Sequence, residues 1–301
     1  MSDRPETRSV AEWGTLALIF ACYGVWLWAI FSLAASWPVL AFLVACLTAA
    51  LHSSLTHEVL HGHPFRSKAL NEALMFLPLT LYFPYNRFRD LHLAHHRDEN
   101  LTCPENDPES NFVAPEAWAA MPGWKQALYR FNNTLFGRVT FGPLLGQLSF
   151  FRSEARAALG GDKAVQLAWA LHFVGAAIVL WIVAQSAMPV WQYLIVAYTG
   201  MGIIKIRTFL EHRAHDDKHG RTVVVEDRGP LSWLFLNNNF HIVHHMHPGA
   251  PWYRLPRLYR QERDRYLAAN DAYVYRSYAQ VFRQYLMHAK DPVAHPLWSR
   301  K

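Results

Sequence analysis

The chain has 301 residues, of which 52% are hydrophobic and only 17% are charged. An average soluble domain carries about 25% charged residues, so this composition disfavours an ordinary soluble enzyme. The formal net charge of +6 would suit a nucleic-acid partner, but no nucleic-acid-binding motif accompanies it. We attribute the basic charge to attraction toward an anionic membrane surface.

Two long stretches contain no Asp, Glu, Lys or Arg. One covers 45 positions, from 13 to 57, and the other covers 41 positions, from 164 to 204. Because a transmembrane helix needs about 20 residues, each stretch is long enough to cross a bilayer twice. Two buried helical hairpins in a soluble protein are the alternative. We expect four transmembrane helices, at about 13–35, 38–56, 164–186 and 190–208.

Shorter elements lie between and after these helices. Residues 73–85 are apolar but too short to span a bilayer, and they contain two prolines, which predicts an interfacial or re-entrant segment. Amphipathic helices are predicted within 116–160, and a basic, aromatic surface segment is predicted at 261–301. Since the sequence has no internal repeats, residues 1–301 are expected to form one domain.

The basic residues predict the orientation of the chain in the membrane. The turns near 36–38 and 186–189 contain no Lys or Arg, and all 29 basic residues lie toward the opposite ends of the helices. The positive-inside rule places such residues in the cytoplasm. We therefore expect an integral protein of a bacterial-type inner membrane, with both termini and all polar segments cytoplasmic.

The sequence contains 17 histidines, and most of them are clustered. The clusters are His57 and His61, then His92, His95 and His96, then His212 and His215, and finally His241, His244 and His245. Spacings of three and four place side chains on one face of a helix, so each cluster can direct several imidazoles at one point. The isolated His172, inside the third predicted helix, is interpreted as a polar residue satisfied within the helical bundle.

The number of clustered histidines indicates more than one metal ion. Imidazole binds iron, zinc, copper and nickel, but a tetrahedral zinc site takes only four ligands. The clustered imidazoles are too many for one such site, and they suit two metal ions with several ligands each. The clusters lie at the ends of predicted transmembrane helices or in polar segments, so they could converge just beyond one face of the membrane.

Three of the clusters form ordered motifs. Box one reads HEVLHGHP from His57, box two reads HLAHH from His92, and box three reads NFHIVHH from Asn239. In this order they resemble the histidine boxes of the membrane fatty-acid desaturase superfamily, which also contains hydroxylases, carotenoid-modifying oxygenases and alkene-forming enzymes. The resemblance covers about residues 40–260. It implies an all-α integral membrane fold with four transmembrane helices, interfacial helices and a cytosolic helical cap that holds a di-iron site.

The resemblance also implies which residues bind iron. The expected ligands are His57, His61, His92, His95, His96, His212, His241, His244 and His245. His212 is included because it lies 29 positions before His241, at about the spacing of a further ligand in similar enzymes. Some relatives have an asparagine four positions before this histidine, where it makes a water-mediated contact. This chain has Thr208 at that position and therefore departs from those relatives.

Other polar residues near the boxes are candidates for supporting roles. His63 and His215 are candidates for additional ligands or for hydrogen-bond partners of the ligands. Asn238 could bond a ring nitrogen or turn the chain. Lys205 and Arg207 either extend toward the membrane surface or hold a substrate head group. The carboxylates that could orient imidazoles, or belong to solvated loops, are Glu58, Glu99, Asp107, Glu109 and Glu211.

By the same resemblance, two iron ions would activate O2 and remove hydrogen from a lipid-like substrate. Electrons would come from a separate ferredoxin-, rubredoxin- or cytochrome-type donor, because the chain has only three cysteines and no CxxC pair. An acyl-chain desaturase is the first expectation. The alternatives are a lipid or fatty-acid hydroxylase, an alkene-forming fatty-acid decarboxylase, and a carotenoid hydroxylase or ketolase.

Two other classes of protein are disfavoured. A histidine-rich metal transporter would place its ligands near the bilayer midplane between broken helices, whereas these clusters lie at helix ends and in polar segments. A structural membrane protein with incidental histidines would rarely contain HxxHH twice by chance.

Overall fold

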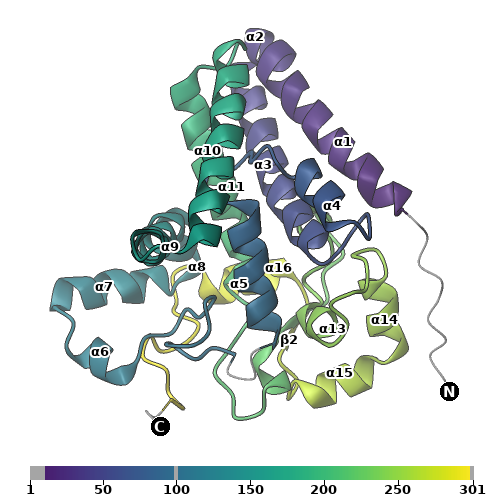
Figure 1. The fold of residues 1–301 in the computed structure, drawn as a ribbon. Coiled ribbons are helices and arrows are strands. Elements are labelled where there is room, and N and C mark those ends of the chain that lie inside the picture. The colour runs from purple at the N-terminus through teal and green to yellow at the C-terminus, as the bar shows by residue number, and fades with distance from the viewer. Residues whose placement is uncertain (1–10, 98–100, 299–301) are drawn as a thin grey trace.

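The computed structural model describes residues 11–97 and 101–298. Helices make up most of it. Figure 1 shows a narrow bundle of long helices above a wider cap of shorter helices and loops. The boundary between bundle and cap is where the histidine boxes lie.

The bundle is built from two helical hairpins. The first consists of α1 (Trp13–Trp28), a π-helical turn (Ala29–Leu33), α2 (Ala34–Ser36) and α3 (Pro38–Leu60). The second consists of α10 (Lys163–Ala184) and α11 (Val190–Thr208). Pro38 begins α3, a position that suits proline because the first N–H groups of a helix have no intrahelical partner.

Small residues let α3 and α11 pack closely. A Cβ atom added to Gly200 of α11 would lie 2.8 Å from the Cβ of Ala49 on α3. Ala45 and Ala41, one and two turns before Ala49, are also fully buried. Close approach of small residues is a common way for helices to associate in lipid, which provides no hydrophobic force between them.

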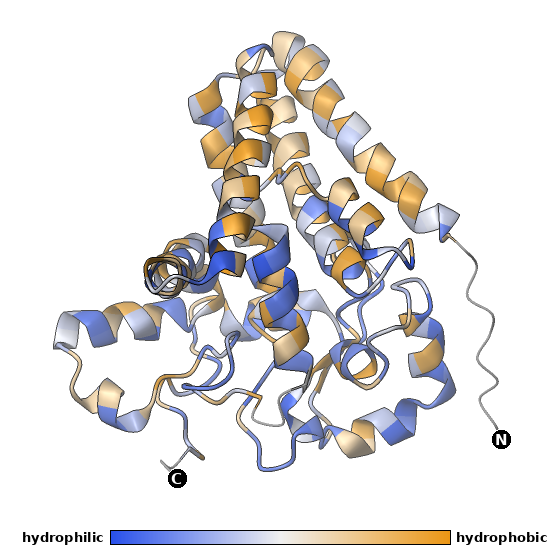
Figure 2. Cartoon of the chain, viewed as in Figure 1, coloured by the Kyte–Doolittle hydropathy of each residue, from blue (hydrophilic) through white to orange (hydrophobic). Residues whose placement is uncertain are grey.

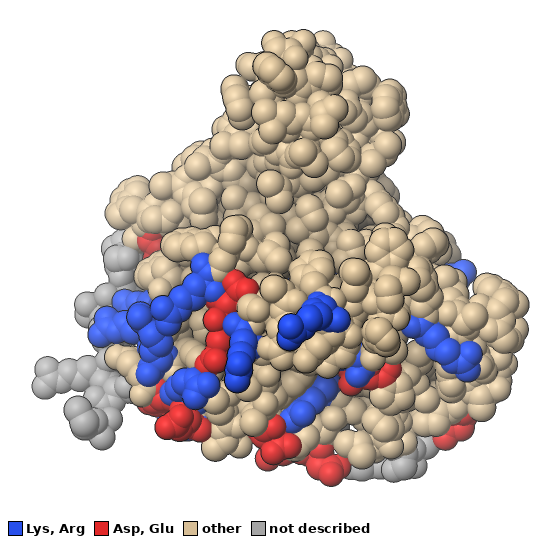
Figure 3. Space-filling view, turned by 180° about the vertical axis from the view of Figure 1, so that it is seen from behind, with Lys and Arg blue, Asp and Glu red and all other residues tan. Residues whose placement is uncertain are grey.

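Three stretches of the described chain are long and apolar enough to cross a membrane: Trp13–Ser36, Pro38–Leu60 and Lys163–Ala184. Large apolar side chains are exposed on them, such as Phe173 and Trp181, which are 63% and 65% exposed. Hydrophobic residues dominate the bundle in Figure 2, and from behind, in Figure 3, its upper part displays no charged side chain. These are the features of a membrane protein.

The helix predicted as the fourth crossing is present, but its surroundings differ from those of the other three. α11 carries Lys205 and Arg207 near its end and packs against α3, α8 (Leu135–Thr140) and α9 (Gly142–Leu159). It is not among the membrane-spanning helices identified by composition in the described residues. Because neighbouring helices rather than lipid cover much of it, α11 does not need an uninterrupted apolar surface.

The segment 73–85 is irregular for most of its length. α4 (Lys68–Leu74) ends near its start, and the next α-helix, α5, begins only at Tyr85. Side chains of the bundle donate hydrogen bonds to carbonyl groups of this segment: Tyr23 to Leu77 at 3.1 Å, Tyr193 to Leu79 at 2.8 Å and His172 to Leu81 at 3.1 Å. Irregular backbone at membrane depth is tolerated where protein satisfies it in this way. The interpretation of His172 as a satisfied bundle residue is confirmed.

The cap collects segments from distant parts of the sequence. Its elements are α5 (Tyr85–Arg97), α6 (Pro115–Ala119), α7 (Gly123–Asn132), α8, α9, a 3-10 turn (His219–Arg221), β1 (Val224–Val225), α12 (Pro230–Leu234), α13 (His241–Met246), α14 (Leu255–Gln261), α15 (Arg263–Ala269), β2 (Val274–Tyr275) and α16 (Tyr278–Tyr285). The predicted helices within 116–160 correspond to α6–α9. β1 and β2 pair in parallel and attach the C-terminal residues to the segment that follows α11.

The C-terminal segment 261–301 is only partly on the surface. α15 exposes most of its charged residues, but Tyr278 and Val281 of α16 are buried in one apolar cluster with Leu210 and Phe235. This cluster fixes the segment beneath the end of α11.

Candidate metal centre

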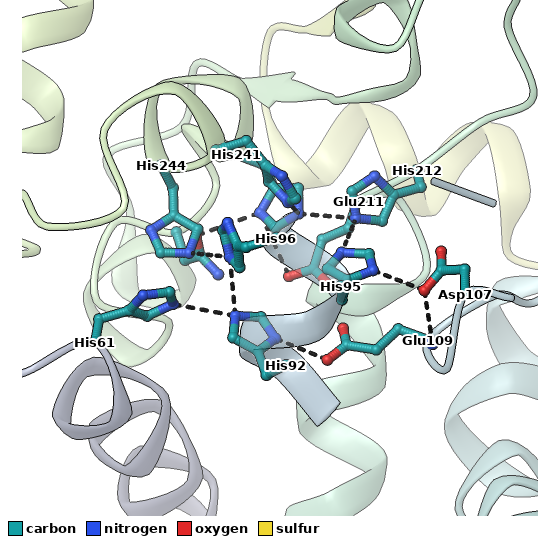
Figure 4. Close-up of polar contacts among 12 residues, drawn as sticks. His61, His92, His95, His96, Asp107, Glu109, Glu211, His212, His241 and His244 are labelled. Atoms are coloured by element: carbon teal, nitrogen blue, oxygen red, sulfur yellow. Dashed lines mark hydrogen bonds and ion pairs between the residues drawn. The ribbon is translucent and has the colours of Figure 1, made fainter. Parts of the chain in front are cut away.

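All nine histidines expected as ligands converge where α3 and α5 meet α13. Figure 4 labels His61, His92, His95, His96, His212, His241 and His244 among them. Four segments supply them. α3 carries His57 in its last turn and His61 directly follows it; α5 carries His92, His95 and His96; the loop after α11 carries His212; and α13 carries His241, His244 and His245.

The nine side chains form two adjacent groups. The five-histidine group consists of His57, His61, His92, His96 and His244, each with a ring nitrogen within 4.8 Å of the others. The four-histidine group consists of His95, His212 and His245, which meet the same criterion, together with His241. Nε2 of His241 lies 3.2 Å from Nε2 of His212 and 3.1 Å from Nε2 of His245. The rings of His96 and His245, one from each group, stack with their centroids 4.2 Å apart.

Helical geometry explains how each HxxHH motif contributes to both groups. Positions four apart on a helix differ by about 40° around its axis, whereas positions three apart differ by about 60° in the opposite sense. On α5, His92 and His96 therefore join the five-histidine group while His95 joins the other. On α13 the division is reversed, because His241 and His245 join the four-histidine group and His244 does not.

The ring nitrogens are placed as metal ligands would be. Nε2 of His92 lies 3.1 Å from Nε2 of His61 and 3.0 Å from Nε2 of His96. Nδ1 of His92 is engaged by a carboxylate, so Nε2 of the neutral ring carries the lone pair. Nε2 of His57 is buried without a hydrogen-bond partner among the described residues. Two ligands that bind one metal ion at about 2.1 Å and at right angles stand about 3.0 Å apart, so the donor set fits a bound cation.

Two carboxylates contact the histidines of α5 that are expected to be ligands, at their other ring nitrogens. Nδ1 of His92 lies 2.7 Å from Oε1 of Glu109, and Nδ1 of His95 lies 2.8 Å from Oδ1 of Asp107. Asp107 also accepts the backbone N–H groups of Thr102 and Glu109. Such carboxylates fix the orientation of the ring and make its opposite nitrogen a better ligand. Asp107 and Glu109 thus occupy the supporting positions considered from the sequence.

Asn238 and Glu211 contact the ring of His241. Nδ1 of His241 lies 3.3 Å from Oδ1 of Asn238 and 3.8 Å from Oε1 of Glu211. Glu211 is also paired with Arg207, with 2.7 Å between Oε1 and Nε. Because the charge of Arg207 is matched by Glu211, this pairing argues against Arg207 as an anchor for a substrate head group. Lys205 lies beside Gly146 of α9, where an added Cβ would be 3.8 Å from its Nζ.

The backbone of His212 is held by a residue that the sequence does not indicate. Lys290 is buried, and its Nζ donates to the carbonyl oxygen of His212 at 2.7 Å and contacts the hydroxyl of Tyr273 at 3.1 Å. The contact joins residues 78 positions apart. A single lysine in a basic C-terminal segment carries no motif that could have revealed it.

His63 is part of box one but lies outside the nine-histidine centre, in a buried cluster with Glu12 and Glu58. Its Nδ1 lies 2.8 Å from Oε1 of Glu12, and its Nε2 lies 3.8 Å from Oε1 of Glu58. Glu58 accepts the backbone N–H of Trp252 at 3.0 Å. The cluster joins the start of α1 to box one, and Glu12 was not singled out from the sequence.

His215 lies apart from both groups. Its Nδ1 accepts the backbone N–H of Asp217 at 3.1 Å, and its Nε2 lies 3.5 Å from Oδ2 of Asp271. These contacts are those of a partly exposed loop residue. Glu99, the remaining carboxylate considered from the sequence, falls outside the described residues.

Burial sets the protonation states of the metal-free centre. Burial and the neighbouring imidazoles lower the pKa of His212, His241, His244 and His245 well below the usual value. Burial acts the same way on His95, but the carboxylates of Glu109 and Asp107 outweigh it and raise the pKa of His95 to about 9. Metal ions bind neutral imidazole, so most of these rings are in the form that binds metal at neutral pH.

Comparison with known proteins shows the family to which the chain belongs. A family model described as fatty acid desaturase matches residues 34–277, which is more than half of the chain. The chain belongs to the fatty acid desaturase family. The predicted family and the predicted oxidoreductase activity are therefore confirmed, and membership together with the histidine groups indicates iron binding.

Two relatives of this desaturase-family chain are beta-carotene ketolases. The enzyme of Paracoccus sp. (strain N81106 / MBIC 01143) is 28% identical over 268 residues, which cover 85% of this chain and 93% of the relative. The enzyme of Paracoccus sp. (strain PC1) is 27% identical over 243 residues, which cover 74% of this chain and 81% of the relative.

Proposed function

We propose that this chain is a di-iron, O2-dependent oxygenase that converts a ring methylene of a carotenoid to a ketone. The observation that carries the proposal is the pair of adjacent histidine groups, with five and four members, whose lone pairs converge. The two ketolase relatives, similar over most of this chain, support the carotenoid as substrate. Among the alternatives drawn from the sequence, the ketolase is therefore preferred to the acyl-chain desaturase.

The nine histidines would hold two iron ions, one in each group. Imidazole is a suitable ligand for iron, and bound iron would supply O2 activation and removal of hydrogen from carbon. The role of the protein is to position and orient. Asp107 and Glu109 fix the rings of His95 and His92, and Glu211 adds a further negative charge 3.8 Å from His241.

The proposed reaction requires electrons from outside the chain. Each oxygenation of the methylene consumes one O2, two electrons and two protons, and releases one water. A second oxygenation at the same carbon produces a geminal diol, which loses water to give the ketone. The cysteines of the described chain are unpaired, so a separate ferredoxin-, rubredoxin- or cytochrome-type protein would supply the electrons.

We propose that the metal centre and both termini face the cytoplasm, and that α11 completes a fourth crossing. The hairpin turns at 36–38 and 186–189 lie at the far end of the bundle from the cap (Figure 1). They contain no Lys or Arg, whereas basic residues gather on the cap (Figure 3). The positive-inside rule supports this orientation.

The test is to express the chain in a carotene-producing host that lacks its own ring oxygenase and to supply isotopically labelled O2. A ketolase will yield a product heavier by one labelled oxygen and lighter by two hydrogens for each oxidised ring. His244→Ala should abolish the product and His215→Ala should not. A hydroxylated carotenoid would redirect the assignment to a hydroxylase. Unchanged carotene with acyl chains lacking two hydrogens would instead assign a desaturase.

A further inference from the structure

An apolar cavity of about 670 Å³ lies outside the two histidine groups, between the bundle and the cap. One face of α1 forms its first wall, with Gly14, Ala17 and Ala21 along it. Leu47 and Leu51 of α3 form the second wall, and α12 with two flanking residues closes the cap side. None of the twelve lining residues is charged. The volume is within the range of about 300–1,000 Å³ that is typical of ligand sites.

Small side chains on α1 make the cavity wide. Gly14, Ala17 and Ala21 recur at spacings of three and four and therefore line one face of the helix. An added Cβ on Gly14 would meet nothing within 4 Å. This wall therefore has room for a group bulkier than a straight hydrocarbon chain, such as a substituted ring.

Trp252 connects the cavity to the metal centre. Its ring lies against that of Trp233, with centroids 5.9 Å apart, and both tryptophans line the cavity. Its backbone N–H donates to Glu58 at 3.0 Å, and Glu58 directly follows His57. The cavity therefore shares a wall with the segments that carry box one and box three.

Leu236 makes a second connection. It lines the cavity, and with Asn237 it forms the turn between α12 and α13. Both residues have left-handed backbone angles, with φ of 49° and 55°. Residues other than glycine adopt this conformation at a cost and often do so near functional sites. The turn places the cavity wall immediately before the helix that carries three of the histidines.

We propose that this cavity binds the ring-bearing end of an uncharged polyene hydrocarbon that arrives laterally from the bilayer. The inference rests on the proposed function and names where its substrate binds. α1 and α3 bring the cavity to the lipid-facing side of the bundle. Trp13 and Trp233 at its margin are 73% and 62% exposed, as is usual for tryptophan at the membrane–water interface. A fatty acid or phospholipid would bring a charged head group, for which the lining offers no partner.

The test uses the iron-loaded full chain in phospholipid nanodiscs, titrated with β-carotene as the probe. Binding is followed by quenching of tryptophan fluorescence and by the carotene retained after purification. Gly14→Trp fills the cavity from α1 and should weaken binding by about tenfold or more. Gly24→Trp is the matched control, because Gly24 lies on the same helix outside the cavity, with nothing within 4 Å of its added Cβ. It should bind as the wild type does.

Iron content separates a blocked cavity from a misfolded protein. Gly14→Trp should retain wild-type iron, and a second variant, Leu47→Trp, fills the cavity from α3 and should weaken binding in the same way. Wild-type affinity in both variants would overturn the cavity as the binding site, even if ketone is still produced. Displacement of carotene by equimolar palmitate would overturn the preference for an uncharged ligand. Binding that depends on Gly14, without any ketone product, would support the cavity while refuting the proposed reaction.

Discussion

Nε2 of His96 and Nε2 of His244 lie 3.1 Å apart, although 148 positions separate them in the sequence. One belongs to α5 and the other to α13, and together they link box two to box three within the five-histidine group. No hydrophobic contact accounts for this meeting of two polar rings in the interior. The metal ion that we propose for this group would account for it, and several predictions about the centre depend on that proposal.

Replacing His244 with Ala should remove iron from the five-histidine group and abolish turnover. The loss should exceed the approximately 10–100-fold effect typical of removing a ligand's hydrogen-bond partner. Iron per chain, measured by elemental analysis, should fall while the four-histidine group retains its metal. His215→Ala is the control, because His215 lies outside both groups. Full iron content in His244→Ala would contradict the assignment of this ligand.

Replacing Glu109 with Gln should weaken iron binding by about 10–100-fold, because the ring of His92 loses the carboxylate that orients it. Competition with a chelator measures the affinity. Glu116→Gln provides the control, since Glu116 is an exposed carboxylate on α6. Equal iron affinity in the two variants would mean that the contact between Glu109 and His92 is incidental.

Lys290→Met should disturb the four-histidine group selectively. The variant removes a buried ammonium that donates to the carbonyl oxygen of His212, and hydrogen bonds to charged groups contribute about 1.5–3 kcal/mol. Spectroscopy that distinguishes the two iron ions should show a change at the ion held by His95 and His212. Lys68→Met, at an exposed position in α4, should leave both ions unchanged. An unaltered spectrum in Lys290→Met would show that His212 is held without this contact.

Gly200→Ala should destabilise the bundle without touching the metal centre. The added Cβ would lie 2.8 Å from the Cβ of Ala49, and overpacking of this kind typically costs about 1–3 kcal/mol. Thermal unfolding in detergent should show a lower midpoint for this variant. Gly24→Ala has open space around its added Cβ and should unfold at the wild-type temperature or above it.

The metal-free protein should lose stability as the pH falls. Burial lowers the pKa of His212, His241 and His245 in the folded state, so below about pH 6.5 the unfolded chain binds protons that the folded chain excludes. His95 acts in the opposite sense, because its raised pKa favours the folded state until the pH passes about 9. Because the gain from His95 is complete by about pH 6.5, thermal midpoints should decline between about pH 6.5 and pH 5. A midpoint that rises toward acid would mean that the rings are protonated when folded.

The two charge-free stretches were enough to identify both hairpins, and the resemblance of the histidine boxes to those of a known family was enough to identify the nine histidines that meet in the structure. The sequence did not show how the nine histidines divide into two groups. We expected each HxxHH motif to direct its side chains at one point, but side chains three and four positions apart are rotated in opposite directions around the helix axis. The sequence also suggested four equivalent crossings, whereas α11 is largely covered by other helices and tolerates Lys205 and Arg207.

The supporting contacts were less accessible to prediction, for a different reason. Asp107 and Glu109 follow box two closely and could be nominated from their position. Glu12 and Lys290 approach the boxes only through the tertiary fold, across 51 positions to His63 and 78 to His212. Isolated charged residues are common in polar segments, so nothing in the sequence distinguishes these two from solvated ones.

The spread of these residues along the chain also constrains how the enzyme is made. The nine clustered histidines of the proposed centre begin at position 57 and end at 245, and the residue that contacts the backbone of His212 is at 290. The ribosome must therefore synthesise the chain past residue 245 before the last of these histidines exists, and past residue 290 before the support of His212 does. Both hairpins precede box three in the sequence and can enter the bilayer before then. Loading of the two proposed iron ions would consequently come after both hairpins are made, and it would draw on the metal pool on the side of the membrane where the cap folds.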